Sequence, residues 1–229
     1  MILTSVLSGP ACGQTTLQLA RLPGVPDQFI GGEILKEAYS RLGIAVVLVD
    51  VPAARALALS SSGQLDGEVH RIAAVEHDYP SLIRISPAIN YIEPSVFTTT
   101  LHFEVSGWPS IKDYNIGIVR GVGSSEAGTA GMKSVQAVTS LENLLLMLDA
   151  GHVELAVTDL LSGRVRVKQM RLDSRIYALS PPLQRVFIYH YLHQQHRALV
   201  PRIEAVLRDM EADGELVRLR ERFVNQVLD

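Results

Sequence analysis

The fold is decided by residues 32–49, which read GEILKEAYSRLGIAVVLV. Residues 32–42 predict a helix, because apolar side chains recur at positions 34, 35, 38 and 42, on one helical face. Gly43 is suited to ending that helix. Residues 44–49 are apolar and mostly β-branched, which is typical of a strand buried on both faces of a parallel sheet.

The segments on either side extend this alternation. We expect strands over residues 16–20 and 65–69 and a helix over residues 53–60. Residues 22–29 are expected to form a loop, because two prolines and a glycine interrupt them. Strand–helix units in succession predict a parallel α/β sheet with right-handed crossovers.

A second α/β unit follows in the other half of the chain. We expect strands over residues 116–119 and 155–158 and, between them, a helix over residues 141–150 with Ser140 as its N-cap. The chain ends in a strand over residues 185–191 and two helices separated by Asp213-Gly214. Open α/β sheets bind ligands beyond the C-terminal ends of their strands, so two such units predict two lobes with a site between them.

Composition excludes several classes of protein. The 229 residues are enough for one large domain or two small ones. Twenty-one Lys and Arg against 24 Asp and Glu give a net charge of -3, which supplies no basic stripe and argues against a nucleic-acid partner. The one cysteine, Cys12, excludes an intrachain disulfide framework and a multi-cysteine zinc site.

The first 14 residues are small and apolar and carry no charge. They resemble the second half of a secretory signal, although a complete signal begins with Lys or Arg. Two interpretations stay open for residues 1–14, namely a truncated signal remnant or an ordinary N-terminal tail. Elsewhere, no apolar run approaches the ~20 residues needed to span a bilayer.

A glycine-rich loop, Arg120-Gly-Val-Gly-Ser-Ser125, follows the strand over residues 116–119. If a helix begins near Ser125, free N–H groups around Gly121 and the hydroxyls of Ser124 and Ser125 would capture an anion such as a carboxylate. The loop lacks the lysine of a phosphate-binding Walker loop. The alternative is an ordinary glycine turn with a serine cap.

Two charged residues stand where expected strands end. Asp159 follows the strand over residues 155–158, where its carboxylate would hold an ammonium group or cap the next helix. Arg71 lies shortly after residue 69, where its guanidinium would clamp a substrate carboxylate or pair with Glu68. The sequence leaves both alternatives open at each position.

Aromatic and histidine side chains complete the candidates. Phe29 and Tyr91 lie in expected loops, where aromatic faces commonly form pocket walls, although Phe29 would equally suit core packing. His190, His193 and His196 lack the spacing of a metal-binding motif, so we expect exposed histidines and no metal site. No nucleophile elbow or other covalent catalyst is present.

An ordered set of short motifs covers roughly residues 16–225 and resembles the periplasmic solute-binding proteins of polar amino-acid ABC importers, family 3 with the type II fold. The motifs are the run over residues 32–43, LDGEVHR (65–71), YPSLIRI (79–85), VRG (119–121), LDAG (148–151) before AVTD (156–159), YHYLH (189–193) and MEADG (210–214). The resemblance implies an α/β, two-lobed Venus-flytrap fold with two mixed sheets flanked by helices. Lobe 1 would comprise residues 15–96 and 188–229 and lobe 2 residues 97–187, with hinges at Val96–Thr100 and Arg185–Tyr189.

The resemblance also implies a function. The protein would be a periplasmic monomer without a cofactor that captures a small polar or zwitterionic molecule, an amino acid or a related organic acid, and delivers it to an ABC permease. The binding residues carried over from the family are Phe29, Arg71, Ser124, Ser125 and Asp159.

Two alternatives to transport accompany this resemblance. One is a small-acid dehydratase on the same fold, with Glu68, His70 and Asp159 as acid and base groups. The other is a ligand-sensing protein that presents its closed form to a membrane receptor.

Overall fold

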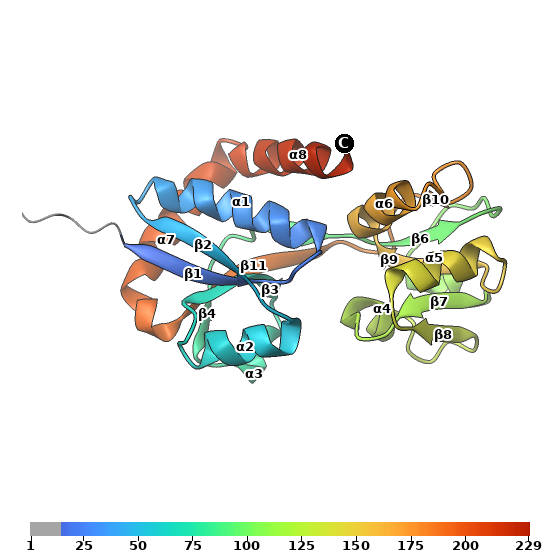
Figure 1. Cartoon of the computed structure of the whole chain (residues 1–229), viewed down its shortest axis with the longest axis horizontal. Coiled ribbons are helices and arrows are strands. Elements are labelled where there is room, and N and C mark those ends of the chain that lie inside the picture. Colours follow the sequence, from blue (N-terminus) through green and yellow to red (C-terminus); the bar gives the residue numbers. More distant parts are fainter. Residues whose placement is uncertain (1–14) are drawn as a thin grey trace, which may run out of the picture.

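The strand after Gly43 lies at an edge of its sheet. The computed structural model describes residues 15–229, which form two sheets in two lobes (Figure 1). Strand β2 (Ala45–Asp50) pairs in parallel with β1 (Thr16–Arg21) at the end of the sheet order β2-β1-β3-β11-β4. Val47 is 48% exposed, so the expectation of a strand buried on both faces is wrong. An edge strand has a neighbour on one side only, and its apolar side chains are correspondingly less covered.

The rest of the first sheet mixes parallel and antiparallel pairs. Strand β3 (Gly67–Ile72) is parallel to β1, whereas β11 (Val186–His193) runs antiparallel to β3. Strands β4 (Leu82–Arg84) and β5 (Asn90–Ile92) also pair with β11. Figure 1 shows helices on both faces, which are α1 (Pro26–Ser40), α7 (Val200–Ala212) and α8 (Glu215–Leu228) on one side and α2 (Ala53–Ser61) and α3 (Val75–Asp78) on the other.

Helix α1 begins six residues earlier than the hydrophobic pattern predicts. Pro26 stands at the first helical position, where its missing N–H is not needed and its φ suits the helix. The expected loop over residues 22–29 is therefore wrong from Pro26 onward. As a consequence, Asp27 and Gln28 lie in the first helical turn, and both side chains are buried.

The second sheet has the strand order β10-β6-β9-β7-β8. Strands β7 (Ile116–Val119), β8 (Val135–Val138) and β9 (Leu155–Asp159) are parallel, and β6 (Pro94–Thr98) and β10 (Tyr177–Ala178) are antiparallel additions. Its helices are a short 3₁₀ turn (Trp108–Ile111), α4 (Gly123–Gly128), α5 (Leu141–Asp149) and α6 (Leu160–Gln169). The Ser140 hydroxyl accepts a hydrogen bond from the N–H of Asn143 at 3.1 Å, as the N-cap prediction requires.

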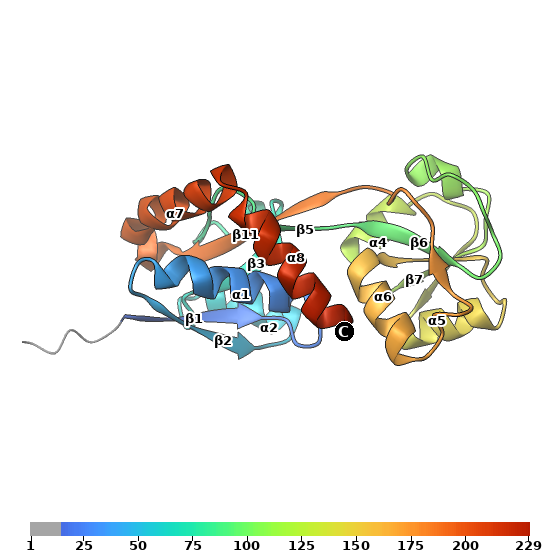
Figure 2. The same ribbon diagram turned by 90° about the horizontal axis from the view of Figure 1, so that it is seen from above.

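The chain crosses between the sheets twice, as Figure 2 shows from above. The first crossing is Glu93, between β5 and β6, and the second is residues 179–185, between β10 and β11. Val96 and Phe97 both lie in β6, which pairs with β9, so the chain enters the second sheet at Pro94, before the expected boundary at residue 96. Arg185 binds Glu93 at 2.7 Å and joins the two crossings.

The C-terminal helices return to the first lobe. Ile203, Leu207, Met210 and Leu219 share one apolar core with α1 and β1. Gly214 adopts a φ of 74° and separates α7 from α8, as the sequence predicts. Helix α8 also contacts α6, so it reaches across to the second lobe. No helix within residues 15–229 is long and apolar enough to cross a membrane.

Candidate functional site

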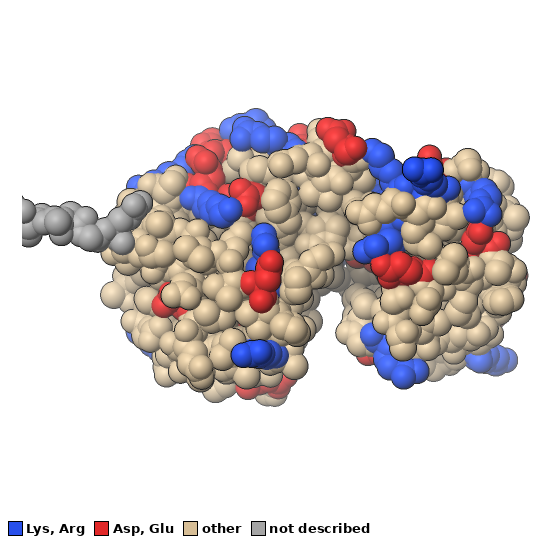
Figure 3. Space-filling model, viewed as in Figure 1, with Lys and Arg blue, Asp and Glu red and all other residues tan. Residues whose placement is uncertain are grey.

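The two lobes enclose a cleft of about 570 Å³. Residues in the last positions of β1, β3, β7 and β9 or just after them line it, so the C-terminal ends of the parallel strands of both sheets face the same space. Figure 3 shows the notch between the lobes, on the side of α2 and α4. Most of the lining is apolar, with a few polar and charged groups, which is the usual make-up of a small-molecule site.

In the first lobe, His70 and Gln28 form a fixed polar wall. The amide nitrogen of Gln28 donates to the His70 carbonyl at 3.1 Å and lies 3.2 Å from Nδ1 of the same imidazole. Nε2 of His70 then donates to the Asp27 carbonyl at 2.9 Å. Burial lowers the pKa of His70 to about 4, so the ring is neutral at pH 7 and both ring nitrogens are engaged. His70 therefore lines the cleft, and neither of its ring nitrogens is free for the acid–base role of the dehydratase alternative.

Gly31 explains how the imidazole fits so closely against α1. A Cβ at position 31 would lie 2.4 Å from Cδ2 of His70. The absence of a side chain at this position therefore lets the helix approach β3.

Asp27 is the most unusual group in the cleft, and its position within the expected loop concealed it from sequence reasoning. Its residue is 2% exposed, Oδ1 accepts from the Asn90 amide at 3.4 Å, and Oδ2 has no hydrogen-bond donor among residues 15–229. Burial and, secondarily, the charge of Asp159 raise the pKa of Asp27 well above its ordinary value.

Arg71 lines the cleft and pairs with Glu68, so the ion-pair alternative is confirmed and the ligand-binding alternative stays a prediction. Nε of Arg71 donates to Oε2 of Glu68 at 2.9 Å, and the arginine side chain is 12% exposed. Within the described part of the chain, Oε1 of Glu68 has no hydrogen-bond partner, and burial raises the pKa of this carboxyl. A second carboxylate, from a ligand, would share a guanidinium that is already positioned.

The wall from the second lobe combines apolar side chains with one polar helix face. Val119, Val122 and Leu141 supply the apolar part. Asp159, Ser162 and Arg166 supply the polar part and lie three and four residues apart, on one face of α6. This spacing was available in the sequence as a signal for Arg166, which sequence reasoning missed.

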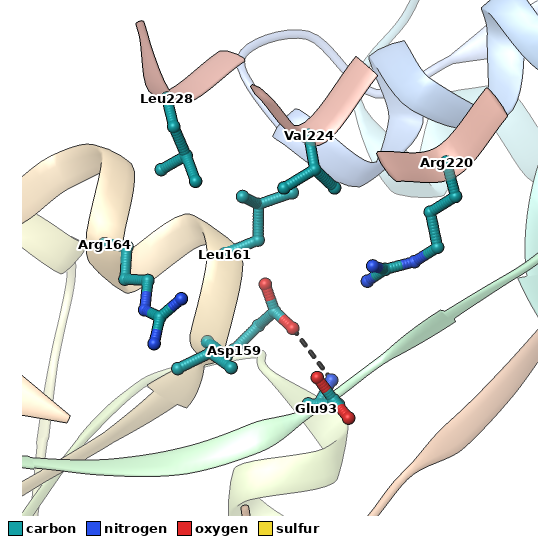
Figure 4. Close-up of a pocket in the computed structure, with 8 residues that line it drawn as sticks. Glu93, Asp159, Leu161, Arg164, Arg220, Val224 and Leu228 are labelled. Atoms are coloured by element: carbon teal, nitrogen blue, oxygen red, sulfur yellow. Dashed lines mark hydrogen bonds between the residues drawn. The ribbon is translucent and has the colours of Figure 1, made fainter. Parts of the chain in front are cut away.

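Asp159 connects the second lobe to the first crossing. One oxygen accepts from the N–H of Ser162 at 3.0 Å and caps α6, and the other accepts from the N–H of Glu93 at 3.0 Å (Figure 4). The capping alternative is therefore correct, and the same carboxylate still lines the cleft. Figure 4 shows Arg164 and Arg220 in the smaller pocket on the α8 side of this residue.

Arg166 is the arginine of the second lobe that lines the cleft. It binds Oε1 of Glu142 through NH1 at 2.7 Å, and its buried Nε has no hydrogen-bond partner among the residues that the structure describes. Arg71 and Arg166 thus bring one guanidinium from each lobe to the same cleft. Such groups bind carboxylates in bidentate fashion.

The two aromatic candidates lie outside the cleft. Phe29 packs edge-to-face on Phe223 of α8, with ring centroids 6.2 Å apart, because α1 turns this position toward the C-terminal helices. Tyr91 lies between the guanidinium groups of Arg220 and Arg185, at 3.8 and 4.2 Å from the ring centroid. Tyr91 lines a separate pocket with Phe187 and Val217. Phe29 and Tyr91 therefore do not belong to the candidate site.

The glycine loop does not form the expected anion site. The N–H of Gly121, which has a φ of 82°, donates to Oε1 of Glu126 at 2.8 Å. The Glu126 carboxylate therefore takes the hydrogen bond from Gly121 that the sequence analysis assigns to a ligand anion. Ser125 is buried, its hydroxyl has no hydrogen-bond partner from Thr15 onward, and Ser124 is half-buried. Val122 is the residue of the loop that lines the cleft.

The histidines of the C-terminal half have structural partners. His190 is buried between the hydroxyl of Tyr39, at 2.8 Å from Nε2, and the Glu68 carbonyl, at 2.7 Å from Nδ1, so its expected exposure is wrong. His196 binds Asp66 at 2.6 Å. Within residues 15–229, no three His, Cys, Asp or Glu side chains come together in a way that could hold a metal ion.

Comparison with known proteins extends these observations. No family model matches the chain. An uncharacterized protein of Shewanella oneidensis is 22% identical over 198 residues, which is 82% of this chain and 74% of that protein. The chain resembles the GluR0 ligand-binding core in complex with L-glutamate, with a TM-score of 0.72 and 12% identity over 94% of this chain and 100% of the other.

Two further solved structures have the same architecture. A histidine kinase sensor domain with similarity to periplasmic binding proteins gives a TM-score of 0.69 at 14% identity, covering 92% of this chain and 96% of its own. The amino-acid ABC transporter substrate-binding protein AbpA from Streptococcus pneumoniae, bound to L-arginine, gives 0.68 at 13%, covering 93% and 96%. The chain therefore has the two-lobed type II fold of the periplasmic binding proteins.

Proposed function

We propose that this protein is an extracytoplasmic binding protein that closes its two lobes on a small zwitterion or carboxylic acid. The observation that carries the proposal is a cleft to which each lobe brings a guanidinium, Arg71 from β3 and Arg166 from α6. A ligand anion that contacts both would favour the closed arrangement by its differential contacts. The apolar side chains between them, such as Val119 and Leu141, suit a ligand with a hydrocarbon body.

The state of the polar groups supports binding over catalysis. Both ring nitrogens of His70 are hydrogen-bonded, and Glu68 is bonded to Arg71. Two of the three acid–base groups of the dehydratase alternative are therefore already engaged in bonds within the protein. The solved structures named above are binding proteins and sensor domains. We therefore expect a monomer that binds its ligand unchanged, with no cofactor.

A thermal shift assay tests this proposal. The full chain is heated with each of the twenty standard L-amino acids and with a series of small mono- and dicarboxylic acids. A ligand at about 100 times its Kd stabilises the folded state by about 2.7 kcal/mol, which raises the Tm of a chain of this size by about 5–10 °C. No shift with any compound of either class would contradict the proposal.

Matched arginine variants locate the site. We expect Arg166→Gln to remove most of the thermal shift, since Arg166 lines the cleft. Arg120→Gln is the control, because Arg120 is an exposed arginine of the same lobe. Equal thermal shifts in both variants would show that the ligand binds outside the cleft.

We propose an ABC permease as the first candidate partner, to which the protein delivers its ligand. Presentation to a membrane receptor is the second candidate, favoured by the histidine kinase sensor domain among the structures of this fold. Deletion of the gene separates the two. Loss of uptake of the radiolabelled ligand supports the permease, whereas unchanged uptake with a lost response to the ligand supports the receptor.

A further inference from the structure

Two large apolar side chains of the first lobe are exposed although they line the cleft. Val25 is 37% exposed and directly precedes α1, and Ile72 is 44% exposed and ends β3. Apolar side chains are costly to leave in water, and exposed ones that share a concave surface mark a binding groove. The remaining exposed large apolar side chains of residues 15–229 do not line this cleft, and they are Val47, Leu146, Phe187 and Val217.

The second lobe presents apolar side chains to the same space. Val119 ends β7, Val122 follows in the glycine loop, and Leu141 begins α5. All three line the cleft and are half-buried. A ligand body that lies between these side chains and those of the first lobe would be removed from water on both sides when the lobes close. The free energy gained grows with the apolar area that is covered.

Two polar side chains of the cleft are bonded to other groups of the protein. The amide nitrogen of Gln28 bonds to His70, and its oxygen accepts from the N–H of Leu22 at 3.4 Å. Both ring nitrogens of His70 are bonded as well. A polar group on the body of a ligand would give up its hydrogen bonds to water without finding a free partner in Gln28 or His70, and this loss disfavours its binding.

We propose that Val25 and Ile72 are specificity-determining residues of the cleft and that the ligand is a small carboxylic acid or amino acid with an apolar body, branched aliphatic or aromatic. The inference rests on the proposed function and narrows it to ligands whose body carries no amide, hydroxyl or charged group. The ligand's carboxylate turns to the arginines of the cleft, and its body covers Val25 and Ile72. Burial of apolar surface, rather than hydrogen bonds to the body, then selects the ligand.

Isothermal titration calorimetry of the full chain with pairs of equal shape tests the proposal. The first pair is L-leucine and L-asparagine, whose side chains have the same branching and the same number of non-hydrogen atoms. Isocaproate and succinamate repeat this difference without an amine, and L-phenylalanine and its pyridyl analogue repeat it with an aromatic ring. Wherever a pair binds, we expect the apolar member to bind about 10- to 100-fold more tightly than the polar member. Its binding should also have the more negative heat-capacity change, which is the marker of buried apolar surface.

Three variants separate selection by these residues from a structural effect. Val25→Thr keeps the shape of the side chain, and threonine suits the helix N-cap position that Val25 holds. Together with Ile72→Thr, it is expected to weaken binding of the apolar member by about 3- to 10-fold and to leave binding of the polar member unchanged. A structural effect would weaken both members equally. Val47→Thr, at an exposed valine of β2 away from the cleft, is the control and should leave the ratio of the two Kd values unchanged.

The outcomes distinguish this inference from the proposed function. If the polar members bind as tightly as the apolar members, or if a compound with a polar body gives the largest thermal shift, the inference is wrong and the binding function stands. If Val25→Thr and Ile72→Thr leave the ratio of the Kd values unchanged, these residues do not select the ligand and the inference is again wrong. If no amino acid or carboxylic acid binds, the proposed function fails and the inference fails with it.

Discussion

The two lobes differ in what they bury. Within residues 15–229, the buried carboxyl and imidazole side chains all lie in the first lobe, and they are Asp27, Glu68, His70 and His190. The polar side chains buried in the second lobe are hydroxyls only, from Ser95, Thr98, Ser125, Thr129 and Thr158. Hydroxyls do not titrate in the ordinary pH range, whereas buried carboxyls and imidazoles do. The first lobe should therefore carry the response to pH, and the second should be indifferent to it.

This difference matches the parts that the lobes contribute to the cleft. The first lobe supplies a buried polar wall with an unpaired oxygen on Asp27 and another on Glu68, the partner of Arg71. The second lobe supplies Val119, Val122 and Leu141 with a single polar face on α6. Both lobes therefore bring polar groups to the cleft, but only the first lobe brings buried carboxyl and imidazole groups to it.

The largest effect that we expect comes from His190. Burial lowers its pKa from 6.5 to about 4, so the unfolded chain takes up a proton at a higher pH than the folded protein does. The stability that the neutral ring contributes is complete above pH 6.5 and is lost as pH falls toward 4, by up to about 3 kcal/mol. His190→Gln cannot be protonated, so its deficit in unfolding free energy relative to the unaltered protein should shrink by about that amount.

Urea unfolding near neutral pH and near pH 4.5, followed by circular dichroism, measures this change. Thr129→Val is the matched variant of the second lobe, because it removes a buried hydroxyl whose bond to the Ser125 carbonyl is 2.7 Å long. Its deficit should be the same at both pH values. If the deficits in unfolding free energy of the two variants changed equally with pH, the two lobes would not differ in their response to pH.

Asp27 should respond to pH with the opposite sign. Burial raises its pKa in the folded protein, so stability falls as pH rises from about 4, where the unfolded chain titrates, through the folded pKa. Asp27→Asn should be more stable than the unaltered protein above this window, by about 1–3 kcal/mol, because it replaces an unpaired acceptor with an amide donor. The advantage should disappear below about pH 4.

Unfolding free energies across the same pH range check this expectation without any ligand. Asp78→Asn serves as the exposed control and should follow the unaltered protein. If Asp27→Asn were less stable at high pH, the carboxylate would have a cation partner and the first lobe would hold fewer unmet charges than the structure indicates.

Local patterns in the sequence were enough to predict much of the fold. Helix periodicity, the Ser140 cap and the Gly214 break each depend on residues within a few positions of one another, and the structure confirms all three. The edge position of β2 depends on which strands pair, and that is decided by segments far apart in the chain. A run of apolar residues does not distinguish a central strand from an edge strand.

The site was harder to predict for the same reason. The two prolines and the glycine of residues 22–29 predict a loop that includes Asp27, whereas Pro26 begins α1. Phe29 and Tyr91 were expected near the ligand on their place after strands, but α8, which is distant in sequence, covers both with Phe223 and Arg220. Asp159 and Arg71 line the cleft, and their local bonds to Ser162 and Glu68 are among the predicted alternatives, whereas the bond from the Glu93 N–H to Asp159 joins segments 66 residues apart.

A smaller effect is expected in the second lobe at Ser140. Its hydroxyl caps α5, so Ser140→Ala should lower the unfolding free energy by about 1 kcal/mol and the Tm by about 2–4 °C. The loss should be equal near pH 7.5 and pH 5, since no titrating group takes part. Ser140→Asp retains an oxygen at this position and is the control that should recover most of the loss at neutral pH. If the loss of unfolding free energy in the alanine variant depended strongly on pH, a titrating group would contribute to the stability of the second lobe.

The smallest effect should come from the ion pair between the two crossings. Arg185 is 53% exposed as a side chain and Glu93 13%, so solvent screens much of their attraction. We expect Arg185→Ala to lower the unfolding free energy by less than about 1 kcal/mol, and the difference should vanish in about 1 M salt, where the screening length is about 3 Å. Arg120→Ala, at an exposed arginine away from the crossings, is the control for the general effect of removing a charge. Because Glu93 also donates its backbone N–H to Asp159, a loss that persists in salt would mean that Arg185 holds this crossing in place for the cleft, and the division of charge between the lobes would then extend to the connection between them.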